Sequence, residues 1–450
     1  MASRASSRPV WQPFATDCLQ FQNPHHSLRR LDMKFLDRRD VLKLAGAAAA
    51  GFGAPALAQA RPALKIASVE TLSGPGSTVN RLWSLGLKYC IDRINAEGGW
   101  NGQKILYAEY DTEGTTGGAS QKTQAAIADG AHIIAHGGSS NIGGQITEDV
   151  RKWNLRNPAA KILFFGLGIE ALELTGAKCH YHFFRFATNA DIRIRALVAG
   201  MKAENALGSK VFSINQNYSW GNDIQAALEQ SSADNSFTLV DKVLHDVNKI
   251  QDFSPYAARI AASGADTVFT GNWGNDLSLL LKTVQAAGLK VRFATTFLDL
   301  PGALSSAGSA ALGYFHAELW NPQAFGAFGQ DLWTDYKAKM GTVPSTSEAK
   351  SILSLLFLQQ ALKSVPETTK IDVDQIAKAL EQTTYKAPTG DVTMRAADHQ
   401  AAWPIVVSKV EQGAKFATDG TDMGFVPIRV IPGGDVVNSV QASCKMQRPS

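Results

Sequence analysis

The sequence predicts an α/β protein of two similar lobes, each built on a parallel central sheet and joined by a multi-strand hinge. Short runs of β-branched and aromatic residues alternate with segments of helical periodicity, a pattern typical of parallel sheets covered on both faces. The alternation restarts in the second half of the chain. Two extended segments, residues 180–188 and 313–320, separate these units and indicate that the chain passes between the lobes more than once.

The first half opens with the strand-like run LKIASVE at residues 64–70. The helix expected near residues 79–96 places Leu82 and Tyr89 on one face, and it stops before Gly98, since glycine readily takes the left-handed conformation that ends helices. The remaining elements expected in this half are a strand at 104–111, a helix at 118–129, a strand at 131–137, a helix at 145–155 and a strand at 161–166.

The second half repeats the pattern, and a further region follows the second extended segment. Strands are expected near 210–215, 237–243, 266–272, 291–296 and 403–410, with helices near 255–263 and 276–287 and more helical stretches after residue 320. We therefore expect a first lobe of residues 61–183, to which 316–402 return, and a second lobe of 184–315, to which 403–450 return.

An export signal precedes the first strand. Arg38-Arg39 lead into an uncharged, Ala-rich run that closes on small residues, the order found in cleaved signal peptides. The paired arginines resemble the twin-arginine type, and the apolar run at 44–57 is too short to span a bilayer. We expect a signal peptide at 33–60 with cleavage near Ala60, translation from Met33, and residues 1–32 to be a mispredicted extension.

The composition of the remainder gives no reason to expect partners that bind by charge. Of 44 Lys and Arg and 40 Asp and Glu residues, the first 60 positions hold 8 and 4, which leaves 36 of each sign. Such balance does not favour nucleic acid or anionic lipid as a partner. Beyond the signal, no apolar run reaches the roughly 18 residues that cross a bilayer. Cys90, Cys179 and Cys444 allow at most one disulfide, whose pairing stays open.

Five motifs occur in order along the chain: INAEGGWNGQKI at 94–105, ELTGAKCHYHFFRF at 173–186, NQNYSWGND at 215–223, TGNWGNDLSLLLK at 270–282 and TGDVTMRAADHQ at 389–400. Together they resemble the type I periplasmic solute-binding proteins of ABC importers, the leucine/isoleucine/valine-binding class. The resemblance implies two Rossmann-like lobes that close like a Venus flytrap on a ligand, a periplasmic location and delivery to a membrane permease. We expect a monomer that binds an amino acid or a related organic acid or amide.

In the first lobe the resemblance places ligand contacts on two loops. Ser139 and Ser140 follow a predicted strand where relatives grip the ligand carboxylate with a hydroxyl, and the adjoining helix N-terminus also favours an anion. Capping that helix is the alternative role of Ser139. Gly168, Ile169 and Glu170 follow the next strand. Glu170 stands where relatives commonly have Thr, so it either meets a cationic or hydroxylated part of the ligand or points away.

In the second lobe, Tyr218 and Trp220 stand where relatives often have aromatic residues, and we expect them to form a wall of the cleft, with ordinary packing as the alternative. Asn272 and Trp273 follow another strand, and Thr295 ends the next one. Relatives that bind amino acids place an acid near this last position to hold the ammonium group, and this chain has none there. That departure argues against a plain branched-chain amino acid and leaves other carboxylates, amides and atypical amino acids open.

Enzyme and metal sites have little support in the sequence. It has no P-loop and no G-x-S-x-G motif, and the glycines at 166 and 168 lack the third glycine of a dinucleotide turn. His132, His136 and the cluster of Cys179, His180 and His182 have no second pair at ligand spacing, so we interpret them as structural and expect no metal or cofactor. The predicted function is a solute receptor rather than an enzyme. A ligand-sensing module of the same fold and a two-lobe hydrolase or lyase are the alternatives.

Overall fold

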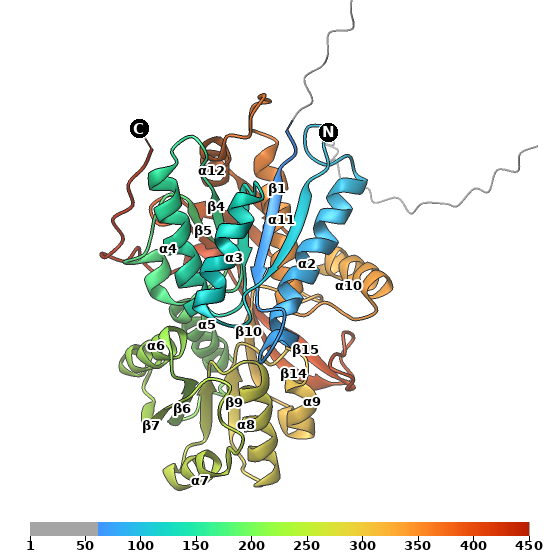
Figure 1. Cartoon of the computed structure of the whole chain (residues 1–450). Helices are drawn as coiled ribbons and strands as arrows, with labels where there is room; N and C mark the ends of the chain where they lie inside the picture. Colours follow the sequence, from blue (N-terminus) through green and yellow to red (C-terminus); the bar gives the residue numbers. More distant parts are fainter. Residues whose placement is uncertain (1–61, 450) are drawn as a thin grey trace, which may run out of the picture. The chain divides into compact units, whose positions relative to one another are not determined.

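The computed structural model describes residues 62–449, so the predicted signal peptide, Met33 and the cleavage position near Ala60 lie outside the described residues. The described chain forms two α/β lobes, each with one central sheet and helices packed against it (Figure 1). This is the architecture that the alternating pattern predicts.

The first lobe is built on an eight-stranded sheet of order β11-β12-β13-β5-β4-β3-β1-β2. Its strands are β1 (Lys65–Glu70), β2 (Leu106–Asp111), β3 (Ile133–His136), β4 (Leu163–Gly166), β5 (Phe183–Arg185), β11 (Thr384–Ala387), β12 (Gly390–Arg395) and β13 (Gln400–Ala402). Strands β1 to β5 run parallel to their neighbours, whereas β11, β12 and β13 pair antiparallel with one another. A later pass of the chain therefore widens a parallel sheet at its β5 edge.

Helices cover both faces of this sheet. They are α2 (Ser77–Ala96), α3 (Thr116–Ala128), α4 (Ser140–Arg156), α11 (Thr346–Leu362) and α12 (Val373–Gln382), with the 3-10 turn η1 (Leu172–Thr175). Helix α10 (Gly326–Met340) packs on α2, where the rings of Tyr89 and Tyr336 meet. Helix α2 packs on α11, and α3 packs on α4. On β4, Phe165 joins the core under α2, while Phe164 joins the core under α3 and α4. Strands buried on both faces explain the uninterrupted apolar runs in the sequence.

The second lobe has a seven-stranded sheet of order β15-β14-β10-β9-β8-β6-β7. Its strands are β6 (Lys210–Gln216), β7 (Thr238–His245), β8 (Thr267–Thr270), β9 (Arg292–Thr295), β10 (Phe315–Glu318), β14 (Ile405–Gln412) and β15 (Met423–Ile431). The first five run parallel, and the β14–β15 hairpin adds antiparallel to β10. The helices are α5 (Ala190–Ala203), α6 (Ser219–Asn235), α7 (Ser254–Ser263), α8 (Gly274–Ala286) and α9 (Ala303–Ala307), with the 3-10 turn η2 (Gly308–Ala311).

The chain crosses between the lobes after β5, after β10 and after β13, and it crosses again after β15. Two of the predicted lobe boundaries therefore differ from those in the structure. Strand β10 belongs to the second sheet, so the return to the first lobe begins after Glu318 rather than at residue 316. The tail beyond β15 and α13 (Gly433–Val436) was expected on the second lobe, but a disulfide between Cys179 and Cys444 fastens it to the first. Gln441 also donates a hydrogen bond to the carbonyl of Leu172 at 2.7 Å.

Most predicted helices and strands lie within a few residues of their expected positions, and α4 shows the largest difference. It begins at Ser140 rather than near residue 145. Gly143 lies in the part of α4 that precedes the expected start, and a Cβ there would lie 2.6 Å from the Cδ1 atom of Ile169. This glycine therefore permits close packing of the helix on Ile169.

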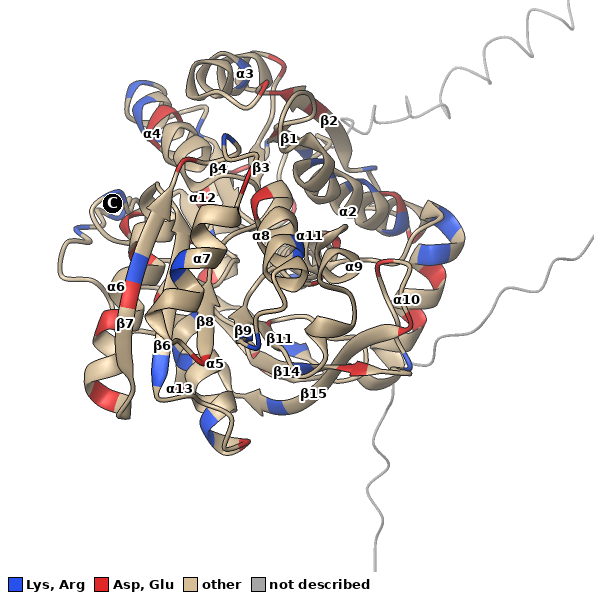
Figure 2. Cartoon of the chain, turned by 90° about the horizontal axis from the view of Figure 1, so that it is seen from below, with Lys and Arg blue, Asp and Glu red and all other residues tan. Residues whose placement is uncertain are grey.

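Charged residues of both signs are interspersed over the face seen in Figure 2. This distribution fits the charge balance of the sequence beyond residue 60. Within residues 62–449, no helix combines the length and the apolar character that a membrane span requires.

Candidate ligand-binding site

A small cavity of about 30 Å³ lies between the lobes, at the carboxyl ends of the parallel strands. This is the edge where open α/β sheets bind ligands. From the first lobe it is lined by Val79, Asn80, Trp83, Gly137, Gly138, Ser140, Gly168, Glu170 and Ser347. From the second lobe it is lined by Tyr218, Trp220, Trp273, Phe297 and Leu300.

The indole ring of Trp83 forms the wall on the first lobe. It lies directly on two glycines, because a Cβ on Gly137 would come within 2.1 Å of the ring and a Cβ on Gly168 within 2.3 Å. The Lys350 ammonium group lies 5.8 Å from the ring centroid. Both glycines are thus required by the ring that packs on them, which is a reason for their place in the strand-end loops.

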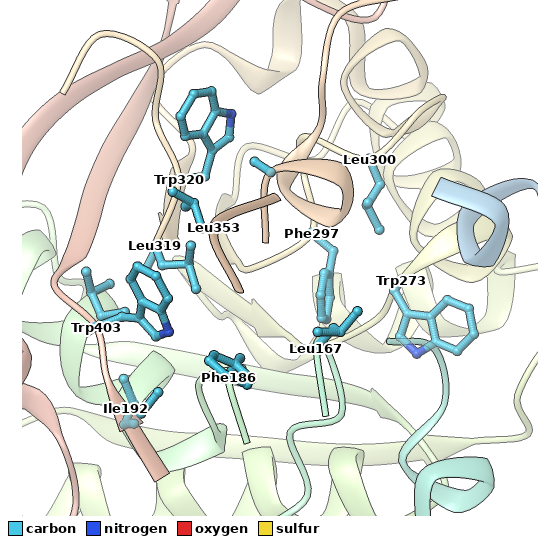
Figure 3. Packing of buried hydrophobic residues seen from close by; sticks show 14 of the residues in the cluster. Leu167, Phe186, Ile192, Trp273, Phe297, Leu300, Leu319, Trp320, Leu353 and Trp403 are labelled. Carbon is cyan, nitrogen blue, oxygen red and sulfur yellow. The ribbon is translucent and has the colours of Figure 1, made fainter. Parts of the chain in front are cut away.

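Aromatic rings form the wall on the second lobe. The Trp220 indole donates to the carbonyl of Gly271 at 2.8 Å, and the Trp273 indole donates to the Tyr218 hydroxyl at 2.8 Å. The rings of Trp220 and Phe297 meet edge to face with their centroids 5.8 Å apart. The indole N–H groups are therefore bonded within the lobe, which leaves ring surface for the cavity. Figure 3 shows Trp273, Phe297 and Leu300 gathered on one side of the buried cluster.

Two hydroxyl groups can donate into the cavity. The Ser140 hydroxyl accepts the backbone N–H groups of Glu170 and Ala171, both at 3.2 Å, so its own hydrogen is left to donate. The Tyr218 hydroxyl accepts from Trp273, and its hydrogen is likewise available. Donors beside the N-terminus of α4 suit a carboxylate group.

Glu170 lines the cavity and belongs to a buried quartet of charges. Its carboxylate accepts from the Arg193 guanidinium at 2.6 and 2.8 Å and from the Lys350 ammonium group at 3.0 Å. Glu318 pairs with the same two cations. All four side chains are buried, and their charges sum to zero.

Charge pairing decides the protonation state of Glu170. Burial alone would raise the pKa of its carboxyl group, but the charges and hydrogen bonds of Arg193 and Lys350 lower the pKa to about 2. The quartet joins the lobes, since Glu170 and Lys350 belong to the first lobe, whereas Arg193 on α5 and Glu318 on β10 belong to the second. Losing one partner would leave a buried charge uncompensated.

The structure places the ten predicted site residues in two groups. Six line the cavity: Ser140, Gly168, Glu170, Tyr218, Trp220 and Trp273. The others contact protein atoms beside it. Ser139 caps α4 by accepting the Asn141 N–H at 3.3 Å, Asn272 bonds His245 at 2.8 Å, Thr295 is buried at the end of β9, and Ile169 packs in the core under α4. Ser139 thus has the role of helix cap, which the sequence offered as the alternative to a ligand contact.

The histidines that raised the metal alternative have protein partners. Both ring nitrogens of His136 face backbone carbonyls, those of Val69 at 2.7 Å and Ser139 at 3.2 Å. Burial lowers the pKa of His136, but the Glu70 carboxylate and these carbonyls outweigh it and raise the pKa above the usual value. His180 bonds the Thr147 hydroxyl at 2.9 Å. Among residues 62–449 no cluster of three or more His, Cys, Asp or Glu side chains has the arrangement of a metal site.

Sequence reasoning missed several cavity residues. Trp83 lies on a helix face whose periodicity indicates only core packing, and Ser347 arrives from α11, more than 200 residues further along the chain. A local signal does exist for Trp83, because glycines at two neighbouring strand ends indicate a flat group packed against both.

Two α/β lobes that enclose a small cavity lined by both define a solute-binding receptor. Residues 63–415 match the family model described as periplasmic binding protein. The chain belongs to this family.

The relatives named next are similar to this protein along most of the chain. The Leu/Ile/Val-binding protein homolog 4 of Brucella melitensis biotype 1 is 48% identical over 91% of this chain and 96% of its own length. The closed structure of the leucine-, isoleucine-, valine-, threonine- and alanine-binding protein from Brucella ovis is 48% identical, with a TM-score of 0.82 over 86% of this chain and 100% of that one. A benzoate-bound solute-binding protein from R. palustris, 18% identical with a TM-score of 0.72 over 85% and 100% of the two chains, shares the fold.

Proposed function

We propose that the protein captures a small aliphatic α-amino acid between its lobes and delivers it to an ABC-type permease from the periplasm, after export by a twin-arginine signal. The supporting observation is the charge of the cavity. Among the described residues that line it, Glu170 is the only charged one, and the quartet to which Glu170 belongs is neutral. A zwitterion, which carries no net charge, matches such a site better than a net anion does.

Residues that line the cavity can bind both the carboxylate group and the ammonium group of the zwitterion. Ser140 and the α4 N-terminus supply donors for the carboxylate group. The Glu170 carboxylate and the faces of Trp220 and Phe297 supply negative potential for the ammonium group, in place of the acid that is missing near Thr295. The expectation against a branched-chain amino acid, based on that missing acid, therefore loses its force, because another carboxylate lies in the cavity.

The volume of the main cavity narrows the class of ligand further. A cavity of about 30 Å³ has the space of roughly two or three water positions, at 10–15 Å³ for each. An amino acid therefore requires the lobes to part somewhat, and short apolar side chains between the walls of Val79 and Leu300 need less widening than extended or ring-bearing ones. The Brucella ovis relative, named for aliphatic and small amino acids, is consistent with this choice.

Calorimetric titration of the mature protein tests the proposal. The panel contains alanine, threonine, valine, leucine and isoleucine, with leucinamide, isovalerate and benzoate as matched compounds that lack one charge or carry a ring. We expect the amino acids to bind at least tenfold more tightly than the amide, the acid and benzoate, since each of these leaves one polar group of the site unpaired. Equal or tighter binding of benzoate would contradict the proposed ligand class.

A further inference from the structure

A second cavity of about 30 Å³ is lined by residues of β10, α10 and β15 and by the loops beside them, and we call it the rear cavity. Its walls include the rings of Trp320, Trp333, Phe416 and Phe425 and the polar side chains of Asp299 and His316. Within residues 62–449, none lines both cavities. In Figure 3, Trp320 lies well apart from Trp273 and Phe297 of the main cavity.

Both lobes contribute to the rear cavity. Trp333 comes from α10 of the first lobe, whereas His316 on β10 and Phe425 on β15 come from the second. Asp299 follows β9 in the second lobe, and its Oδ2 atom accepts the Thr346 N–H at the start of α11 at 2.8 Å. A molecule held here would touch both halves of the receptor.

Two polar atoms of the rear cavity are left without a hydrogen-bond partner. They are Oδ1 of Asp299 and Nε2 of His316, which lie 3.3 Å apart, within ion-pair distance but not in hydrogen-bond geometry. The His316 side chain is only 3% exposed. Buried polar atoms are nearly always paired, so two unpaired ones that face each other indicate a missing donor. In the tautomer with its proton on Nδ1, His316 offers an acceptor at Nε2, as Asp299 does at Oδ1.

The charge of the walls selects the kind of donor. Among the described residues that line the rear cavity, Asp299 is the only carboxylate, and none is Lys or Arg. Aromatic faces attract cations, and a carboxylate among them strengthens that preference. An ammonium group has three N–H donors, enough for both unpaired acceptors.

We propose that the rear cavity binds the primary ammonium group of a small alkylamine, with N–H donated to Asp299 and His316 and the alkyl part against the rings. The cavity volume limits the ligand to a few non-hydrogen atoms. The proposal is independent of the amino acid site, which has its own residues on the other side of the 297–300 loop.

Titration of the whole mature protein with ethylammonium chloride, against sodium chloride at equal ionic strength, tests the proposal. We expect one saturable site, at least tenfold weaker affinity for tetramethylammonium, which has no N–H, and at least tenfold weaker binding of ethylammonium by Asp299→Asn. The asparagine keeps an oxygen for the Thr346 N–H, so the start of α11 is retained.

Trp333→Ala provides a second variant at a partly exposed position, and Trp153→Ala on α4 is its matched control. We expect Trp333→Ala to bind ethylammonium at least fivefold more weakly than the wild type and Trp153→Ala to bind it with unchanged affinity. Absence of a saturable site would mean that water alone fills the cavity and would overturn the proposal. So would equal affinity for tetramethylammonium, or a loss in Trp220→Ala as large as that in Trp333→Ala, which would place the cation in the main cavity.

Discussion

Single glycines set the shape of the main cavity at the residue scale. Gly168 has no room for a side chain, since a Cβ would lie 2.3 Å from both the Gly137 carbonyl oxygen and the Trp83 ring. Alanine there must displace the ring or the loop that carries Glu170. We expect Gly168→Ala to weaken amino acid binding at least tenfold, measured by calorimetry, because the first-lobe wall moves.

Gly117→Ala on α3 is the matched control for that substitution. Its Cβ would meet no atom within 4 Å, and alanine favours helices more than glycine does. Affinity in this variant should equal that of the wild type. If Gly168→Ala also binds normally, Trp83 does not form the wall that we describe.

The buried carboxylate of Glu170 predicts an acid-dependent stability. Because Arg193 and Lys350 lower its folded-state pKa to about 2, against about 4.3 in an unfolded chain, its ionised form stabilises the fold. That contribution is complete above pH about 4.3 and is lost as the pH falls towards 2. Denaturant unfolding should show Glu170→Gln less stable than the wild type at pH 6, with the gap narrowing between pH 4 and pH 2. A gap that stays constant would show that Glu170 does not titrate as described.

At the scale of elements, periodicity predicted most helices and strands because each has an amphipathic or a fully buried pattern of its own. The strand-end loops were predicted as the site from the family resemblance, and the fold is consistent with it because parallel strands deliver their carboxyl ends to one edge. Contacts between elements far apart in the sequence could not be predicted from this periodicity. Lys350 reaches Glu170 across 180 positions, and the capping box of Ser345 and Glu348 that starts its helix says nothing of what the helix packs against.

The C-terminal tail is another element whose packing partner could not be predicted from the sequence. Beyond residue 60 the sequence has three cysteines, and only the fold shows that Cys179 and Cys444 come together while Cys90 is buried as a free thiol. Arg448 adds an ion pair to Glu381 at 2.6 Å, so the disulfide, the Gln441 hydrogen bond to Leu172 and this ion pair together hold the tail on the first lobe.

Removing this disulfide should lower stability. The bridge closes a loop of 265 positions, and such cross-links contribute about 2–5 kcal/mol by restricting the unfolded chain. We expect the double variant Cys179→Ser, Cys444→Ser to lose about that much unfolding free energy in urea. Reductant should destabilise the wild type and the control Cys90→Ala but leave the double variant unchanged. A double variant as stable as the wild type would mean that the disulfide contributes nothing to stability.

At the scale of the whole molecule, the two lobes meet at the main cavity, at the charge quartet and at the rear cavity. The main cavity is too small, and too closely walled by rings from both lobes, for an amino acid to enter without the lobes separating. The quartet lies beside the first two crossings, where Arg193 follows β5 and Glu318 ends β10. It is therefore placed to persist near the hinge while the distant edges of the lobes part.

This arrangement predicts a change of shape on binding. Because ligand contacts from both lobes exist together only in the closed form, an amino acid should shift the population towards closure. Small-angle scattering should show a smaller radius of gyration with saturating leucine than without it. Gly168→Ala should need proportionally more leucine for the same change, since its defect is in binding rather than in the hinge. If a tightly bound amino acid leaves the scattering curve unchanged, the lobes do not move, and the ligand must enter by a route within a fixed cleft.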